Sequence, residues 1–333
     1  MTSARLAEIV HRFSTARILV IGDVMLDEFI WGKVSRISPE APVPVVEVLR
    51  EECFPGGAAN VARNLAEFTP HSRIFGIVGQ DAHAERLKTI LRAEGVGLDA
   101  LVQDAAQHTV VKTRLIARQQ HVVRIDREQR LTLSPEQAAR ALEQIEALLP
   151  ELEAIIIEDY GKGLLAQEFA TPLCALAHRA GKILAIDPNP HNPVRWEHAT
   201  VIKPNRAEAF ASANHLPTEP AERPAEDPAL LAVGRTLGER WNCDQLLITL
   251  GEQGILLFQR HAPPYHTPTR ALKVFDVSGA GDTVIALYTL ALCAGATPPE
   301  AAEIANHASG VVVGKLGTAT CTRDELLASF AAD

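Results

Sequence analysis

A turn of small residues beside an acid is the stretch of this sequence best suited to chemistry. Residues 276–283 read DVSGAGDT, where Gly279, Ala280 and Gly281 precede Asp282 and an apolar run that predicts a buried helix. Such a turn exposes unpaired backbone N–H groups at the positive end of the helix dipole, where a phosphate can bind. A carboxylate there could take the proton from a hydroxyl that attacks a phosphoryl group. Alternatively, Asp282 is only a favourable acid in the first turn of a helix.

Two further motifs offer groups for the phosphates of a nucleotide. Asn205 and Glu208 lie one helical turn apart, and their oxygens suit a hydrated Mg²⁺ that carries phosphates. The alternative is an ordinary helix cap with an acid at its third position. Thr249, Gly251 and Gly254 supply a hydroxyl and room for close approach at a strand end, although a tight hairpin explains them equally well.

The N-terminal part carries groups suited to hydroxyls. Asp23 ends an apolar strand and Asp27 follows four residues later, in the place where open α/β sheets bind ligands. Gly56 and Gly57 precede a helix whose first turn holds Asn60, an amide that can both donate and accept. Turn capping by the acids and an ordinary loop before a helix are the alternatives.

The elements that must position these residues alternate between strand and helix. This alternation predicts a mostly parallel sheet covered by helices on both faces, a Rossmann-like α/β fold. The strands are expected at 16–23, 73–79, 154–159, 182–187, 254–259 and 271–275, with two more at the start of 201–210, before a helix, and in 245–254, before a glycine turn.

Two β-rich segments, 29–52 and 109–126, differ from this pattern and predict a small β-sheet lid on a single domain of residues 1–333. The second segment carries Lys112, Arg114 and Arg124, which could meet an anionic substrate. The lid could also pair with a second subunit, or its charges could merely keep exposed strand edges soluble.

Bulk composition narrows the classes of function. The net charge of −9 over 333 residues argues against a nucleic-acid surface. Five scattered cysteines fit reduced thiols in the cytoplasm, and no apolar run is long enough to span a membrane. Neither a GxxxxGK[ST] P-loop, a GxGxxG fingerprint nor a hydrolase elbow is present.

The order of the motifs is more specific than any one of them. An acid after the first strand, then GGxxN, NxxE, TxGxxG and DxxGAGDT, resembles the ribokinase-like (PfkB) sugar kinases over about residues 16–325. Within that family, GDVMLDEFIWG, PGGAANVARNLA, EDYGKG and IKPNRAE are most similar to kinases of bacterial heptose biosynthesis. Those enzymes phosphorylate O1 of D-glycero-β-D-manno-heptose 7-phosphate on the way to ADP-heptose and lipopolysaccharide core. Since the sequence ends soon after the last motif, we expect a stand-alone kinase.

The resemblance implies a role for each matching residue, with ATP and Mg²⁺ as cofactors. Asp282 would be the catalytic base and the turn from Gly279 to Gly281 its anion hole. The residues implied for ATP and Mg²⁺ are Asn205, Glu208, Thr249, Gly251, Gly254 and, near the adenine, Asn306. Asp276 with the 312–317 loop would hold a monovalent cation such as K⁺.

The sugar side of the site follows in the same way. The implied contacts with the sugar hydroxyls are Asp27, Gly56, Gly57, Asn60 and, more weakly, Asp23 and Asp159. We expect Lys112, Arg114, Arg124 or Lys162 to meet the distal phosphate and a homodimer to form through the lid. A PfkB kinase for another sugar and a non-catalytic sugar- or nucleotide-binding protein are the alternatives.

Overall fold

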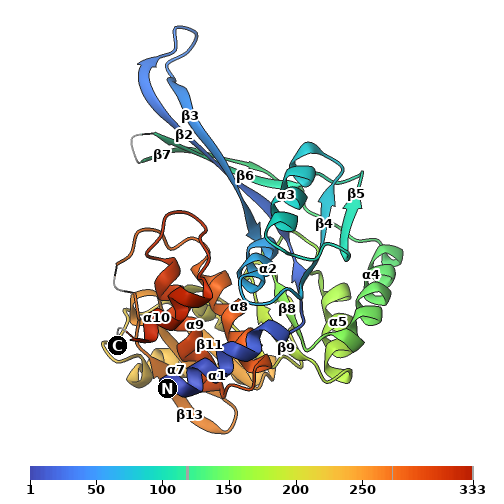
Figure 1. The fold of residues 1–333 in the computed structure, drawn as a ribbon, viewed down its shortest axis with the longest axis vertical. Helices are drawn as coiled ribbons and strands as arrows, with labels where there is room; N and C mark the ends of the chain where they lie inside the picture. The colour runs from blue at the N-terminus through green and yellow to red at the C-terminus, as the bar shows by residue number, and fades with distance from the viewer. Residues whose placement is uncertain (118–119, 272, 332–333) are drawn as a thin grey trace.

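The computed structural model describes residues 1–117, 120–271 and 273–331, which form a helix-covered sheet with a second sheet standing off it (Figure 1). The larger sheet has nine strands in the order β13-β12-β11-β10-β9-β8-β1-β4-β5. Its strands are β1 (Ile18–Gly22), β4 (Ser72–Gly79), β5 (Leu101–Asp104), β8 (Ala154–Glu158), β9 (Ile183–Asp187), β10 (Val201–Ile202), β11 (Gln245–Thr249), β12 (Ile255–Gln259) and β13 (Ala262–Thr267). All neighbours are parallel except β11–β12 and β12–β13, which are antiparallel.

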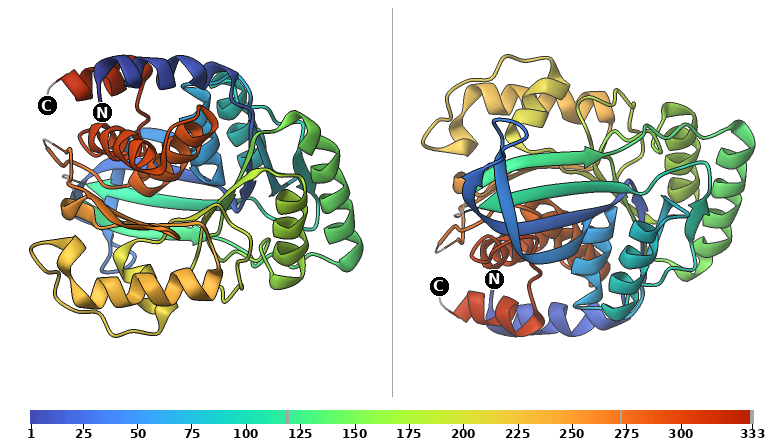
Figure 2. Two further views of the ribbon diagram at one scale, coloured as in Figure 1. Left: turned by 90° about the horizontal axis from the view of Figure 1, so that it is seen from below. Right: turned by 90° about the horizontal axis from the view of Figure 1, so that it is seen from above.

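Helices cover both faces of this sheet, as the two end-on views show (Figure 2). Successive strand residues point to opposite faces, and each face builds its own apolar core: Val20 and Ile156 belong to one, and Ile21 and Ile157 to the other. The first face packs against α1 (Ser3–Arg12), α2 (Ala58–Ala66), α3 (Ala82–Ala93), α8 (Ala280–Cys293), α9 (Pro298–Val312) and α10 (Arg323–Ala331). The second packs against α4 (Pro135–Leu148), α5 (Gln167–Arg179), α6 (Arg206–Ala213) and α7 (Pro228–Trp241).

Helix α8 lies in the middle of the first face, and every residue from Asp282 to Ala291 is buried. A helix that is apolar all round must be enclosed by its neighbours. Helices α2 and α9 flank it, so its N-terminus is held at the carboxyl edge of the sheet.

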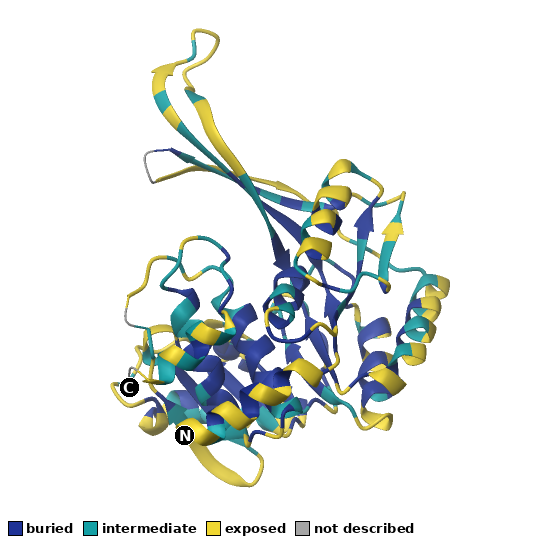
Figure 3. Cartoon of the chain, in the orientation of Figure 1, coloured by how far each residue is buried: buried dark blue, intermediate teal, exposed yellow. Residues whose placement is uncertain are grey.

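The lid is a four-stranded sheet in the order β3-β2-β6-β7. Its strands, β2 (Val24–Ile37), β3 (Pro44–Gly57), β6 (Val110–Ala117) and β7 (Gln120–Arg127), overlap the expected segments, and β2 and β3 extend beyond the first of them. Residues 118–119 lie outside the described ones. The far ends of β2 and β3 are mostly exposed, whereas the ends next to the body are buried (Figure 3).

The expected α/β fold with a β lid is therefore confirmed, but the expected strand at 271–275 is wrong. Residue 272 is not described, and the others form no strand. Val274 and Phe275 are about two-thirds exposed, and the N–H of Phe275 donates to the carbonyl oxygen of Val313 at the end of α9. A short apolar run does not distinguish a strand from the wall of a cavity.

Among the described residues, the structure has no helix long and apolar enough to cross a membrane.

Candidate active site

The turn before α8 brings the backbone N–H groups and Asp282 together as the motif suggested. Gly279 is the N-cap residue with φ 78°, a left-handed conformation that favours glycine. A Cβ atom on Gly279 would lie 2.7 Å from Nδ2 of Asn60, so the side chain must also be absent for space. The first N–H groups of α8 thus face the same space as the carboxylate of Asp282.

Two donors hold the carboxylate of Asp282. The Nδ2 atom of Asn60 donates to Oδ2 at 2.6 Å, and the hydroxyl of Tyr160 donates to Oδ1 at 3.2 Å. Burial raises the pKa of Asp282 to about 6, while Asn60, the charge of Lys203 and Tyr160 oppose that rise. A carboxylate with a pKa near neutrality is suited to act as a general base.

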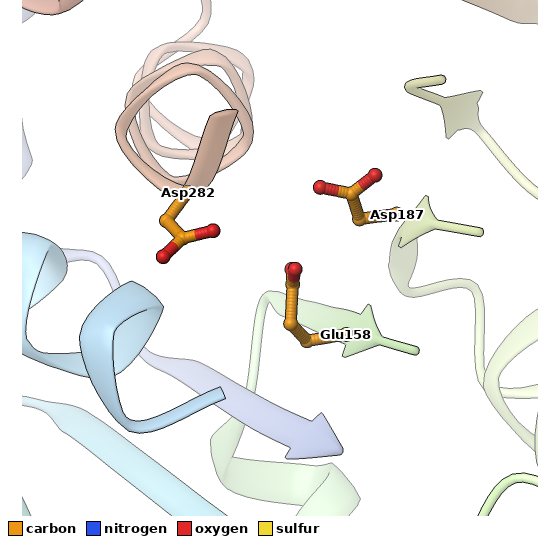
Figure 4. Close-up of side chains that lie close together, drawn as sticks. All are labelled: Glu158, Asp187 and Asp282. Atoms are coloured by element: carbon orange, nitrogen blue, oxygen red, sulfur yellow. The ribbon is translucent and has the colours of Figure 1, made fainter. Parts of the chain in front are cut away.

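Next to Asp282 lies a buried group of charges (Figure 4). Among the described residues, Glu158, Asp187 and Asp282 each place one oxygen within 4.8 Å of the others. The Nζ atom of Lys203 is 2.7 Å from Oδ2 of Asp187, and a Cβ on Gly281 would lie 3.3 Å from that Nζ. Lys203 therefore connects the acids with the anion-binding turn.

These buried groups shift one another's proton affinity. Burial and the neighbouring Asp187 raise the pKa of Glu158 well above its usual value. Burial alone would lower the pKa of Lys203, but Asp187 and Glu158 raise it, so the lysine stays charged.

The donor set also fits a magnesium ion. Buried carboxylate oxygens are the hard ligands that Mg²⁺ prefers. Atom Oε2 of Glu158 is buried and has no hydrogen-bond partner among the described residues, and Asp187 lies beside it. Glu158, Asp187 and Lys203 were missed in the sequence, although each is a charged residue at or just beyond the end of an apolar strand.

A cavity of 850 Å³ opens beside this group, which is large enough for a nucleotide. Its walls come from the strand ends, the start of α6, the turn before α8 and one side of α9. The predicted residues that line it are Asn205, Glu208, Thr249, Gly251, Gly254, Gly279, Ala280, Gly281, Asp282 and Asn306.

Asn205 and Glu208 form the helix cap that the sequence left open as an alternative. Oδ1 of Asn205 accepts from the N–H of Glu208, and Oε2 of Glu208 accepts from the N–H of Asn205. Burial and the nearby Asp187 raise the pKa of Glu208. The cap orients both side chains at the cavity wall, so the two interpretations are compatible.

Asn306, which was predicted to lie near the adenine, and Asp276, which was predicted to hold a monovalent cation, both form hydrogen bonds within the chain. Nδ2 of Asn306 donates to Oγ1 of Thr267 at 3.1 Å and to the carbonyl of Pro268, and so holds the cavity wall. Asp276 accepts from the N–H groups of Ser278 and Gly317, which joins the turn before α8 to the loop after α9.

On the sugar side, Asp23 and Asp159 accept hydrogen bonds from the backbone of a loop. Oδ2 of Asp23 accepts from the N–H groups of Tyr160 and Lys162 at 2.9 and 3.0 Å. Asp159 accepts from the N–H of Gly161 at 2.8 Å and from Nδ2 of Asn192 at 2.9 Å. These hydrogen bonds are the turn capping that the sequence left open for Asp23, and Asp159 makes the same kind of contact. The sugar contacts expected of both acids stay predictions.

The other sugar residues gather where the lid joins the body. Asp27 is in β2, paired along the lid with β3, in which Gly56 and Gly57 lie. Gly57 has φ 58°, and a Cβ there would lie 2.4 Å from the carbonyl oxygen of Asp23. Asn60 follows in the first turn of α2, so the GGxxN motif links the lid to Asp282.

Every cation expected for a distal phosphate already has an acidic partner. Arg114 pairs with Asp27 at 2.5 Å, and Arg124 pairs with Asp126 at 2.8 Å. The Nζ atom of Lys112 is 3.6 Å from oxygens of both Asp126 and Glu128. The last of the four, Lys162, pairs with the same glutamate at 2.7 Å.

The chain shares its fold with solved sugar kinases. Arabidopsis thaliana ribokinase, complexed with ribose and ATP, superposes with a TM-score of 0.71 over 94% of this chain and 98% of that one, at 18% identity. Escherichia coli phosphofructokinase-2, in complex with potassium, gives 0.76 over 95% and 99%, at 20% identity. At these identities the likeness concerns the fold alone.

Sequence comparison establishes the family. The bifunctional protein HldE of Pelobacter propionicus is 41% identical over 99% of this chain, and that of Caulobacter vibrioides is 42% identical over 97%. The matched part is 66% and 65% of those proteins, so the chain spans slightly less than two-thirds of their length. The profile of the pfkB family carbohydrate kinases matches residues 15–325. The chain therefore belongs to the pfkB family of carbohydrate kinases, which are phosphotransferases.

Proposed function

We propose that this chain transfers the γ-phosphoryl group of ATP to O1 of D-glycero-β-D-manno-heptose 7-phosphate, in the synthesis of ADP-heptose for lipopolysaccharide. The relatives at about 40% identity support this substrate, as do the stretches around Asp27, Asn60 and Asp282. The observation that carries the kinase activity is the juxtaposition of Asp282, the Gly279–Gly281 turn and Lys203 at one end of a nucleotide-sized cavity.

In the reaction, Asp282 takes the proton from the anomeric hydroxyl. The O1–phosphorus bond forms while the bond from the γ-phosphorus to the bridging oxygen breaks, and ADP leaves with the electron pair. The N–H groups of the Gly279–Gly281 turn and the charge of Lys203 stabilise the negative charge that builds up on the phosphoryl oxygens.

Kinases of this family use ATP with Mg²⁺. In this chain Asp187, Glu158 and Glu208 would hold the metal, directly or through water, and the ion would neutralise charge on the phosphates. Asp276 and the 312–317 loop are our candidates for a K⁺ site.

For the distal phosphate we favour Lys112. It is the lid cation held most loosely by its acidic partners, at 3.6 Å from each, and its side chain is 12% exposed. A phosphate dianion can replace Asp126 and Glu128 as its partner. Arg114, Arg124 and Lys162 are paired more closely, and their contribution depends on how the lid rearranges when the sugar binds.

We also propose that two copies pair through their lids. Both outer strands of the lid expose apolar side chains, namely Val48 and Leu49 on β3 and Val122, Val123 and Ile125 on β7. Exposed apolar strands are prone to pair with another chain. The expected dimer can be tested by light scattering, with Val123→Lys predicted to give the monomer.

We place the reaction in the cytoplasm, where ATP and reduced cysteines occur together.

Release of ADP in the presence of MgATP tests the proposed substrate. We expect turnover with the heptose 7-phosphate and none with ribose, fructose or fructose 6-phosphate. Turnover with another sugar alone would keep the kinase site and reject the heptose, whereas no turnover with any sugar would favour a binding protein.

A further inference from the structure

The loop after β8 is built in a way that the proposed reaction does not yet explain. It runs from Asp159 to Gly163, and two of its glycines have positive φ, 68° at Gly161 and 105° at Gly163. A Cβ on Gly163 would lie 2.0 Å from the carbonyl oxygen of Leu131. The loop is therefore confined to one path by its own sequence and its neighbours.

Two buried acids fix the same loop from its backbone. Asp23 receives the N–H groups of Tyr160 and Lys162, and Asp159 receives that of Gly161. Asp23 and Asp159 are 5% and 6% exposed. Together the two carboxyl groups accept hydrogen bonds from three consecutive N–H groups, which fixes the backbone of the loop.

The one side chain that this loop delivers to the catalytic base is Tyr160. Its ring lies against Gly57, where an added Cβ would be 3.5 Å from Cδ2, and its hydroxyl is 3.2 Å from Oδ1 of Asp282. Asn60 occupies the other carboxylate oxygen. A carboxylate has about four lone-pair sites, so a substrate hydroxyl can still reach Asp282 with both donors in place.

We propose that Tyr160 is a positioning residue for Asp282: its hydroxyl donates to Oδ1 and holds the carboxylate in the orientation that accepts the proton. Asp23 and Asp159 act one step further away, by holding Tyr160. This inference depends on the proposed role of Asp282 as the base, which Asp282→Asn tests separately.

Several charges face Asp282, and they set the background for any change at Tyr160. Asp27 in β2, Glu158 at the end of β8 and Asp187 at the end of β9 disfavour its ionised form, whereas Lys203 favours it. Replacing Tyr160 by Phe alters none of these charges, so it isolates the hydrogen bond.

The test is the pH dependence of kcat and kcat/KM for Tyr160→Phe. A hydrogen bond to a carboxylate stabilises its ionised form. Loss of the bond should therefore raise the apparent pKa on the acid side of the pH–rate profile (the acid limb) by about 0.5–1 pH unit. We expect kcat on the alkaline plateau to stay within about fivefold of the wild type, as suits a residue that orients the base without moving the proton itself. An unchanged acid limb would overturn the inference.

The matched control is Tyr265→Phe. It removes another tyrosine–carboxylate hydrogen bond, from the hydroxyl of Tyr265 to Oε1 of Glu303 at 2.5 Å, away from Asp282. A purely structural effect of a lost phenol would lower stability in both variants and leave both acid limbs in place. A limb that moves equally in both variants would also reject the proposal.

A second measurement decides the question if Tyr160→Phe does not fold. The chain has three tyrosines, so the double variant Tyr265→Phe/Tyr288→Phe keeps only Tyr160. Growth on 3-fluorotyrosine then places a more acidic phenol, which is a stronger donor, at this position alone. The acid limb should move downward relative to the same double variant with ordinary tyrosine. No movement, or movement upward, would contradict the proposed role.

Discussion

Replacement of Lys203 by methionine tests two roles of this lysine, which are to pair with buried Asp187 and to stabilise negative charge on the phosphoryl group. Lys203 is 3% exposed, 2.7 Å from Asp187, and close to the turn that receives the phosphates. Methionine keeps a similar unbranched shape without the charge. The change leaves Asp187 buried without its cationic partner. It also removes the positive charge of the lysine from beside the reacting phosphoryl group.

The cost in stability follows from the buried pair. Removing one partner of a buried ion pair typically destabilises by about 3–5 kcal/mol, because the remaining charge is uncompensated. Burial raises the pKa of Asp187 and Lys203 lowers it, so the variant's Asp187 should have a still higher pKa. An acid whose folded pKa lies above its unfolded value destabilises increasingly as pH rises from the unfolded pKa toward the folded one. The stability deficit of Lys203→Met should therefore be smaller at pH 5.5 than at pH 8, by up to about 1.4 kcal/mol per pH unit.

The kinetic cost should be larger in kcat than in the KM for the sugar. Removing one group that stabilises developing charge typically lowers kcat by about 10²–10³. Urea unfolding at pH 5.5 and 8 and steady-state ADP release measure the two effects. The control is Lys182→Met, which loses a lysine whose Nζ donates to the carbonyl oxygen of Leu152, outside the cavity. Equal values of kcat for the two variants, or a deficit independent of pH, would refute this reasoning.

Three further outcomes follow from the site. Asp282→Asn should lower kcat by about 10² or more with near-normal substrate binding, measured by stopped assays and calorimetry, and normal turnover would reject the base. Because burial raises the pKa of Asp282 to about 6 and the base must be ionised, kcat/KM should fall about tenfold per pH unit below that value; a flat profile down to pH 5 would exclude this carboxylate. Lys112→Met should raise the KM for the sugar phosphate by about tenfold with little change in the KM for ATP, since one charged contact to phosphate is lost. If Arg124→Met raises it equally, no specific role for Lys112 remains.

Local motifs made the turn before α8 predictable. The spacing of Gly279, Gly281 and Asp282 determines both the conformation of the turn and the direction of the acid, so the sequence alone contains that information. The Asn205–Glu208 pair was recognised for the same reason, although its cap could not be distinguished from a metal-binding role.

The remaining contacts depend on which strands become neighbours. Glu158 and Asp187 end β8 and β9, and Lys203 directly follows β10, so the three meet only because these strands are adjacent and parallel. The pairing of Asp27 with Arg114 likewise requires β2 and β6 to run side by side. No local pattern encodes such distant pairings. For this reason the sequence shows that charged residues follow apolar strands, but it does not show which of these residues contact one another.

The measurement that tests the central proposal most directly is ³¹P NMR of the product made from MgATP and D-glycero-β-D-manno-heptose 7-phosphate. The account predicts a new phosphate signal coupled to the anomeric proton and ADP in equal amount, with both formed about 10²-fold or more slowly by Asp282→Asn. A phosphate on any other hydroxyl, or ADP without a phosphorylated sugar, would contradict transfer to O1.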